Sequence, residues 1–509
     1  MTFNELKKTN ASMQTMTTEN GATMYATTGT KLVDMNFKVA SYRNMSVATI
    51  VNDFADAYFE NPIDAVRWLF FARDIRGNGL GERRLFRICI QWLATQNPKF
   101  VINMIHHMAE FGRYDDIFSI LMCNPIVDRE IFSFIKEQIT EDVENMSNSK
   151  PISLMAKWLP SVNTSSLKTR KIAKYIVSGI GGTERAYRKV LANLREYLDV
   201  VEVKASDNRW DEIDYNTVPS QANIKYNNAF MKHDEIRRIN YLDALKSGDS
   251  KAKINTSVLF PYEVVGGYSK GIINMWDSHI DKEDIALEMM WKNLPDIGLN
   301  EDVLVVADGS GSMTCQVSGS TTALDIANSL AIYTAEHNKG EFRNKYITFS
   351  SRPRFVDFSN AETLKDKLNI AFKHDEVANT DIEAVFHLIL NTAKKYHYTQ
   401  SDMPSRILII SDMEFDWGTD PIDDNLFNAL ITGYSDAGYK MPKLVFWNVN
   451  SRTCGIPVHK NELGFALVSG FSTTILNMVM SDKLDPAEIL HDAIYDERYH
   501  IVEAMYRLN

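Results

Sequence analysis

The chain lacks the features that mark membrane and secreted proteins. No apolar stretch approaches the ~18 residues that a membrane span requires, and the first residues lack the apolar core of a signal peptide. The four cysteines (Cys89, Cys123, Cys315 and Cys454) are far apart and form no Cys-x-x-Cys pair, which is typical of reduced thiols. We therefore expect a cytoplasmic protein with no membrane segment.

An excess of positive charge is also missing. The formal net charge of −11 argues against attraction of the whole protein to nucleic acid. The charge is uneven, however: the chain is acidic from about residue 300 onward and net basic from about 150 to 260. A local basic surface therefore remains open.

The length predicts more than one domain, because 509 residues exceed what one hydrophobic core normally supports. Residues 1–45 are rich in Thr, Asn and Met with weak periodicity and are predicted to form an extended or partly ordered arm. We expect an α-helical region at 46–295, an α/β domain at 296–480, and a C-terminal helix at 481–509 that packs back on the body.

The region 46–295 has helical periodicity. Phe54, Tyr58, Val66 and Leu69 recur at three- and four-residue spacings, as in a helix that buries one face. Short proline or glycine turns separate successive stretches, which predicts a HEAT-like solenoid or ring. The glycine-rich segment 77–81 follows a helical pattern instead of a strand, so we interpret it as a helix–helix corner and not a phosphate loop.

From Glu301 the pattern alternates between strands and helices. This alternation is typical of a doubly wound, mostly parallel (Rossmann-like) sheet. The predicted strands are 302–307, 345–349, 406–411, 443–449 and 465–468, and the predicted helices are 322–337, 361–372, 382–395, 423–437 and 486–508.

A polar loop follows the first of these strands. Asp308, Ser310 and Ser312 alternate with glycines directly after the apolar run 303–307. Open α/β sheets bind ligands at the carboxyl ends of their strands. Oxygen ligands without His or Cys suit a hard cation, with Mg²⁺ favoured and Mn²⁺ or Ca²⁺ as alternatives.

Two later segments extend this pattern. Thr380 lies at the entry to the predicted helix 382–395, where a capping hydroxyl would lie, and Asp412 is the first residue after the strand 406–411. An Asp-x-Ser-x-Ser loop, then a Thr, then an Asp after a later strand resembles the metal-ion-dependent adhesion site of the von Willebrand A domain. The alternative is a polar strand-to-helix turn with capping hydroxyls.

A second candidate site lies in the basic part of the helical region. Its cations alternate with tyrosines, so they would neutralise phosphates while the rings offer stacking faces for RNA bases. The alternative is a solvated helix face whose tyrosines pack inward. The candidate RNA-binding residues are Lys168, Arg170, Lys171, Lys174, Arg185, Arg188, Lys189 and Arg195.

The pairing of a long helical region with a C-terminal von Willebrand A domain resembles the Ro/TROVE family of RNA-binding proteins, and in particular an uncharacterised Ro-like branch. The resemblance implies a ring of helical repeats, binding of small non-coding RNA on a basic surface, and a ribonucleoprotein. It rests on segments spread over nearly the whole chain, namely residues 18–23, 31–37, 71–77, 112–116, 157–161, 218–220, 233–234 and 259–263.

Two functions therefore remain open. The first is a Ro-like scaffold that binds structured or misfolded RNA and carries a divalent-metal domain. The second is a metal-dependent protein-interaction module without nucleic acid, in which a partner's carboxylate completes the metal's coordination. We do not expect an enzyme, because no nucleophile elbow, phosphate loop or general base at diagnostic spacing accompanies the carboxylates Asp412, Glu414 and Asp416.

Overall fold

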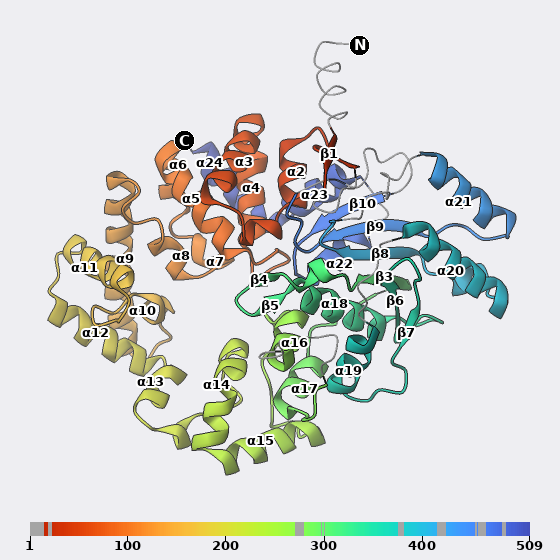
Figure 1. Ribbon diagram of the computed structural model, residues 1–509. Coiled ribbons are helices and arrows are strands. Elements are labelled where there is room, and N and C mark those ends of the chain that lie inside the picture. The colour runs from red at the N-terminus through yellow and green to blue at the C-terminus, as the bar shows by residue number, and fades with distance from the viewer. Residues whose placement is uncertain are drawn as a thin grey trace. The chain divides into compact units, whose positions relative to one another are not determined.

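The computed structural model describes residues 15–18, 23–269, 279–296, 298–299, 301–374, 381–414, 424–453, 456, 465–480 and 485–508. The chain divides into two compact units (Figure 1). The sheet unit comprises Met1–Ser46 and Ile254–Ala493, and the helical unit comprises Val47–Lys253 and Ile494–Asn509. The domain boundaries predicted from the sequence stay a prediction. The compact units differ from them in grouping residues 254–295 with the sheet.

The helical unit consists of short to medium helices, and its described residues between 47 and 253 contain no strand, as predicted. The curved or closed ring stays a prediction. The helices are α3 (Val47–Glu60), α4 (Pro62–Arg73), α5 (Arg83–Gln96), α6 (Pro98–Met104), α7 (Met108–Phe111), α8 (Tyr114–Phe118), α9 (Pro125–Ser147), α10 (Met155–Trp158), α11 (Leu167–Gly179), α12 (Glu184–Tyr197), α13 (Val201–Ser206), α14 (Ser220–His233) and α15 (Glu235–Ser247).

Three of these helices begin in the same way. Asn61, Asn97 and Asn124 are the N-cap residues of α4, α6 and α9, and each is followed by a proline. The asparagine side chain accepts a hydrogen bond from a first-turn backbone N–H, and proline fits the first helical position because it has no N–H to satisfy. The residues 77–81 connect α4 to α5, which confirms the predicted helix–helix corner.

The C-terminal segment is not the single helix predicted over 486–508. It forms α23 (Pro486–Ile494) and α24 (His500–Arg507), separated by a 3-10 turn at Glu497–Tyr499. The Asp496 carboxylate accepts a hydrogen bond from the backbone N–H of Arg498 and so starts a new turn at this point. Within the helical unit, α24 packs against α4 and α6.

The sheet unit is built around six strands: β3 (Val303–Asp308), β6 (Lys345–Phe349), β7 (Phe355–Asp357), β8 (Arg406–Ser411), β9 (Lys443–Asn448) and β10 (Phe465–Ser469). Their order is β10-β9-β8-β3-β6-β7, and all neighbours are parallel except the antiparallel β7. Numbered along the chain, this is the order 3-2-1-4-5-6 of a doubly wound fold. The chain reverses its direction of progress between β3 and β8, which makes that gap the topological switch point.

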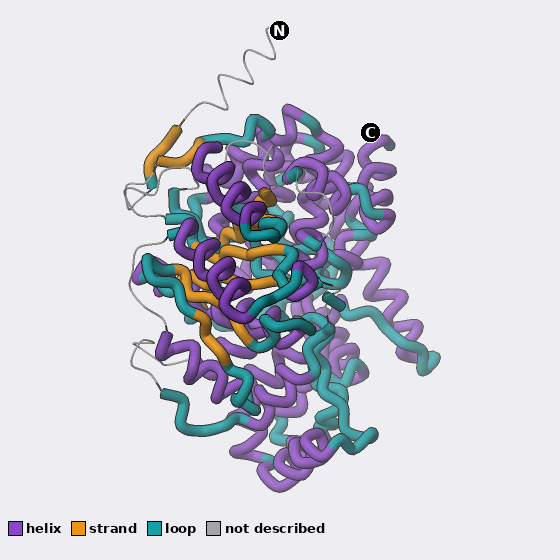
Figure 2. The backbone as a smooth tube through the Cα atoms, turned by 90° about the vertical axis from the view of Figure 1, so that its right-hand side faces the viewer, coloured by secondary structure: helices purple, strands orange, loops and turns teal. Residues whose placement is uncertain are grey.

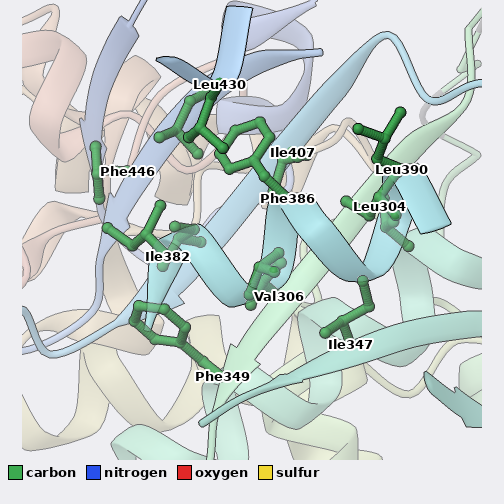
Figure 3. Packing of buried hydrophobic residues seen from close by; sticks show 14 of the residues in the cluster. Leu304, Val306, Ile347, Phe349, Ile382, Phe386, Leu390, Ile407, Leu430 and Phe446 are labelled. Carbon is green, nitrogen blue, oxygen red and sulfur yellow. The ribbon is translucent and has the colours of Figure 1, made fainter. Parts of the chain in front are cut away.

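Helices cover the sheet on both faces (Figure 2). On one face, α20 (Ile382–Tyr396) and α21 (Asp424–Asp436) enclose a core with alternate residues of the strands (Figure 3). This core includes Leu304, Val306, Ile407, Phe446 and Phe386. On the other, α18 (Ala323–His337) packs against β3, β6 and β8, and α22 (Thr474–Val479) packs against β10. The predicted doubly wound sheet is therefore observed.

Further helices complete this unit. α16 (Pro261–Ser269) contacts α17 (Ile285–Lys292) and α18, and α19 (Leu364–His374) packs against α17 and α18. Among the described residues, no helix combines the length and the apolar character needed to cross a bilayer.

Residues 31–43 are more ordered than the extended or partly ordered arm predicted at the N-terminus. They contain α2 (Lys31–Phe37) and are mostly buried in the sheet unit. The side-chain amide of Asn448 donates to the Phe37 carbonyl at 2.8 Å, and the Ser469 hydroxyl accepts from the Ala40 N–H at 3.1 Å. The physical reason is the apolar content of this segment, which is buried against β10.

Candidate metal centre

Asp308 ends β3 at the switch point of the sheet. Its side chain is 2% exposed. One carboxylate oxygen accepts a hydrogen bond from the Ser310 backbone N–H at 2.9 Å, and the other accepts from the Ser411 hydroxyl at 2.6 Å. Ser411 ends the neighbouring strand β8, so hydrogen bonds from the loop after β3 and from the end of β8 orient this carboxylate.

The two serines of the loop lie beside each other. The hydroxyl oxygens of Ser310 and Ser312 are 3.0 Å apart, and both side chains are half-buried. Ser312 belongs to a 3-10 turn, Gly311–Thr314, that follows the strand directly. Two hydroxyl oxygens at this spacing offer adjacent ligands to one hard cation.

Asp412 enters the same site from the end of β8. It is 1% exposed, and one of its carboxylate oxygens, Oδ2, accepts no hydrogen bond in the described part of the chain. The next residue, Met413, is buried and has a φ of 60°, a left-handed conformation that is strained for a side chain of this type. The strained turn allows the Glu414 N–H to donate to the other Asp412 oxygen at 3.2 Å.

The electrostatics of Asp412 reflect a carboxylate that lacks a full counter-charge. Burial, and next the negative charge of Asp308, raise the pKa of Asp412 to about 7. The Ser312 hydroxyl and the Arg452 guanidinium offset part of this rise. A divalent cation between Asp308 and Asp412 would relieve both causes, so the donor set fits a hard metal ion.

Arg452 lies next to this pair of carboxylates, although the sequence did not single it out. Its guanidinium Nη2 is 3.5 Å from Asp412 Oδ2, and its Nη1 donates to the Cys315 sulfur at 3.0 Å. The backbone N–H of Arg452 donates to Glu414 at 2.7 Å, and Thr453 donates to the same carboxylate. The loop after β9 is therefore tied to the candidate site by the buried Glu414.

The structure describes four of the five predicted metal ligands. Asp308, Ser310, Ser312 and Asp412 come together at the carboxyl ends of β3 and β8, whereas Thr380 lies outside the described residues. The N-cap of α20 is Asp381, which accepts from the Ala384 N–H at 2.9 Å. No three His, Cys, Asp or Glu side chains gather within the described ranges, so a metal here depends on the hydroxyl oxygens.

The candidate RNA residues occupy the helix pair α11 and α12, and we call the set the α11–α12 cations. Most of them are exposed: Lys168, Lys171, Lys174, Arg185, Arg188 and Lys189. Lys174 forms an exposed ion pair with Glu184 at 3.1 Å. An exposed pair of this kind holds its cation weakly, so Lys174 stays accessible to phosphate.

Two other α11–α12 cations have structural contacts. Arg195 donates to the Ala156 carbonyl at 2.8 Å, to the Leu159 carbonyl at 2.6 Å and to the Ser161 hydroxyl at 2.8 Å. Arg170 donates to the Thr164 carbonyl at 3.2 Å. These two arginines therefore stabilise loops. Their spacing in the sequence does not predict this structural role.

Two of the three tyrosines in this region, Tyr175 and Tyr187, pack against the protein instead of presenting stacking faces to RNA. Tyr187 is buried and donates to the Pro160 carbonyl at 3.0 Å. Tyr175 donates to Asp128 at 2.6 Å and packs edge-on against Phe132. Tyr197, which is 39% exposed, donates to the Lys150 carbonyl. The inward packing weighed as the alternative therefore describes Tyr187 and Tyr175.

Comparison with known protein families gives matches over both halves of the chain. Residues 18–125 and 127–297 match the family described as "Domain of unknown function (DUF2828)", and residues 302–501 match "Domain of unknown function (DUF7788)". The first match covers more than half of the chain. The protein belongs to the DUF2828 family. Neither matching family is described as TROVE or as a von Willebrand A domain, so both resemblances stay predictions.

Individual relatives add little about function. This DUF2828 member is 28% identical over 508 residues to "Uncharacterized protein L728" of Acanthamoeba polyphaga mimivirus, covering 93% of this chain and 86% of the relative. A solved structure, "Crystal structure of Deinococcus radiodurans RO (RSR) protein", aligns over 91% of this chain and 94% of its own, with a TM-score of 0.40 and 12% identity. That TM-score does not establish a common fold.

The raised pKa of Asp412 predicts how the metal-free protein responds to pH. A carboxyl group whose folded pKa lies above its unfolded value contributes stability below the unfolded pKa, and this contribution is lost as pH rises through about 7. We expect Asp412→Asn to raise the melting temperature of the metal-free protein by several degrees at pH 8 and to change it little at pH 4. Thermal melts in a chelating buffer at both pH values measure this, and an equal effect at the two pH values would contradict it.

Proposed function

We propose that the sheet unit binds a divalent cation through Asp308, Ser310, Ser312 and Asp412, as a von Willebrand A-like domain with a metal-ion-dependent adhesion site. The observation that carries this proposal is the convergence of two buried carboxylates and two hydroxyls at the carboxyl ends of β3 and β8. The strand order supports it, because doubly wound sheets bind ligands at their topological switch point. Mg²⁺ is the favoured ion, since all the ligand atoms are hard oxygens.

The bound cation would serve for recognition. With two carboxylates and two hydroxyls, the ion keeps at least one open position, which an Asp or Glu of a partner protein would fill. We propose a binding protein and not an enzyme, because Glu414, a buried carboxylate two residues after Asp412, accepts hydrogen bonds from Arg452 and Thr453 and so has a structural role. Isothermal titration of the protein with Mg²⁺ and Mn²⁺ tests the proposal: binding of one ion per chain supports it, and no binding contradicts it.

A second function, RNA binding by the helical unit in the manner of a Ro-like scaffold, is supported by a separate observation. Six α11–α12 cations are exposed, and four of these, Lys168, Lys171, Arg185 and Lys189, have neither an ion pair nor a side-chain hydrogen bond among the described residues. Such cations are available to neutralise phosphates, and each contact releases counterions on binding.

A charge reversal on this surface tests RNA binding there. We expect replacement of Lys168, Lys171 and Lys189 by glutamate to weaken binding of a structured small RNA at least tenfold and to reduce the slope of affinity against salt by about one unit per lost phosphate contact. Filter binding over a salt series measures both quantities. Glutamate at Lys99, Lys232 and Lys251, three exposed lysines elsewhere in the helical unit, is the matched control. Unchanged affinity in the folded triple variant would contradict RNA binding by this surface.

A further inference from the structure

Three separate sequence segments meet in the helical unit. The Arg73 guanidinium, from the segment 71–77, donates to Asp116 at 2.8 Å, and Asp116 belongs to the segment 112–116. From that same segment, the Arg113 guanidinium lies 4.0 Å from the ring centroid of Trp158, which belongs to 157–161. Arginines that are far apart in the sequence, Arg73 and Arg113, therefore lie close together in the structure.

The arginines of this cluster outnumber the carboxylates that they pair with. Arg87 bridges Asp115 and Asp116, at 2.7 Å from each, and Arg113 pairs with Asp115 at 2.9 Å. Together with Arg73, three guanidinium groups are therefore paired with two carboxylates. One positive charge is left over in this network, in a protein whose overall charge is −11.

A fourth arginine increases the excess. Arg83 is exposed and makes no hydrogen bond or ion pair with the described residues. Neighbouring residues partly desolvate the guanidinium, although the residue as a whole is exposed. This desolvation, and next the positive charges of Arg113 and Arg87, lower the pKa of Arg83. Arg83 is also the first residue of α5, whose first turn has no acidic residue and no side-chain cap. A cation at a helix N-terminus is opposed by the helix dipole, and the attraction of Asp115 and Asp116 does not outweigh the causes that lower the pKa of Arg83.

An aromatic ring and a lysine border these cations. Trp158 is half-buried and has Arg113 over its ring, and the Lys157 ammonium group lies 5.9 Å from the same ring. Lys157 makes no hydrogen bond or ion pair with the described residues. A ring beside unpaired cations is the combination by which proteins hold single-stranded nucleic acid, with phosphates on the cations and bases stacked on the ring.

We propose that Arg83, Arg87, Arg113, Lys157 and Trp158, here called the Arg83 patch, bind single-stranded RNA. Arg83 and Lys157 contact phosphates, because neither makes a hydrogen bond or ion pair with the described residues, and a base stacks at Trp158. Arg87 and Arg113 are held by Asp115 and supply a fixed positive field. The inference rests on the proposed RNA function and assigns the single-stranded part of the RNA to residues other than the α11–α12 cations.

The experiment is fluorescence anisotropy of the full chain with a labelled twelve-nucleotide oligouridine RNA over a salt series. We expect the double variant Arg83→Glu and Lys157→Glu to lose at least tenfold in affinity and about two units of salt slope. Trp158→Leu should lose about tenfold with an unchanged slope, because stacking releases no counterions. The Lys99→Glu and Lys232→Glu double variant is the control and should change affinity less than twofold.

The outcomes separate the two proposals. If the wild-type protein binds neither oligouridine nor a structured RNA at low salt, the RNA function fails and the patch with it. If the wild-type binds oligouridine but the Arg83 patch variant binds equally well, the patch is wrong and the RNA function stands. Arg83→Gln with Lys157→Gln, which adds no negative charge, is the second variant in case the reversal impairs folding, and it should also lower both affinity and slope.

Discussion

Asp412→Ala is expected to abolish high-affinity binding of divalent cations by the sheet unit. Asp412 is a buried charged ligand in the proposed site, with one oxygen that accepts no hydrogen bond from the described residues. Loss of a partner that merely supports a ligand costs metal affinity about 10- to 100-fold, so loss of the ligand itself should exceed ~100-fold. Isothermal titration with Mn²⁺ measures the change.

The fold should survive this substitution, because Asp412 lies beyond the hydrogen-bonded residues of β8. Asp357→Ala is the matched control, since Asp357 is an exposed carboxylate at the end of β7 and outside the site. If Asp412→Ala folds and binds Mn²⁺ as tightly as the control, the assignment of Asp412 as a ligand is wrong.

Arg452→Gln should act in the opposite direction and tighten divalent-ion binding by about tenfold, or about 1.4 kcal/mol. The Arg452 guanidinium lies 3.5 Å from Asp412 Oδ2, so its positive charge competes with a metal ion for the same carboxylate. Its bond to the Cys315 sulfur holds the guanidinium in that position. Without the positive charge of Arg452, a metal ion binds the carboxylates of Asp308 and Asp412 with no competing cation beside them.

The control for this variant is Arg343→Gln, which removes an exposed arginine of the same unit that has no ion pair in the described structure. It should change Mn²⁺ affinity less than twofold. Unchanged or weaker binding by Arg452→Gln, in a protein that melts normally, would mean that Arg452 supports the site instead of competing with the ion.

The sequence predicted the sheet well because its strands are long apolar runs. The strands β3, β6, β8, β9 and β10 lie within one residue of the predicted ranges at each end. The antiparallel strand β7 was missed, since three residues give no period to recognise. The predicted helix over 486–508 was wrong at Asp496, where a local side-chain cap outweighs a continuous apolar pattern.

The candidate metal residues Asp308, Ser310, Ser312 and Asp412 could be predicted because they lie at or just after the ends of the buried strands β3 and β8. Arg452 could not, because its position depends on the order of strands: β9 lies beside β8, which brings the loop after β9 to Asp412. The sequence showed Glu414 only as one of three carboxylates close together in the chain; in the structure it is buried and accepts hydrogen bonds from that same loop. In the sequence, the one indication that Glu414 supports the site was its position two residues after Asp412.

The Arg83 patch was hidden for a related reason. Arg83, Arg113 and Lys157 are far apart in the chain, and tertiary packing alone brings their segments together. In contrast, the cations of α11 and α12 are close in sequence and were easy to notice. Proximity in sequence did not distinguish a loop-holding arginine such as Arg195 from an exposed lysine such as Lys171.

The most direct test of the metal site is a crystal structure of the full chain grown with Mn²⁺, with anomalous scattering used to locate the ion. The account predicts one strong anomalous peak at the carboxyl ends of β3 and β8, with Ser310 and Ser312 hydroxyl oxygens about 2.0–2.6 Å from it and the carboxylates of Asp308 and Asp412 around it. In the same crystal structure, the Arg452 guanidinium should lie farther from Asp412 than the present 3.5 Å. No peak at this position, with Arg452 still beside Asp412, would contradict the central claim.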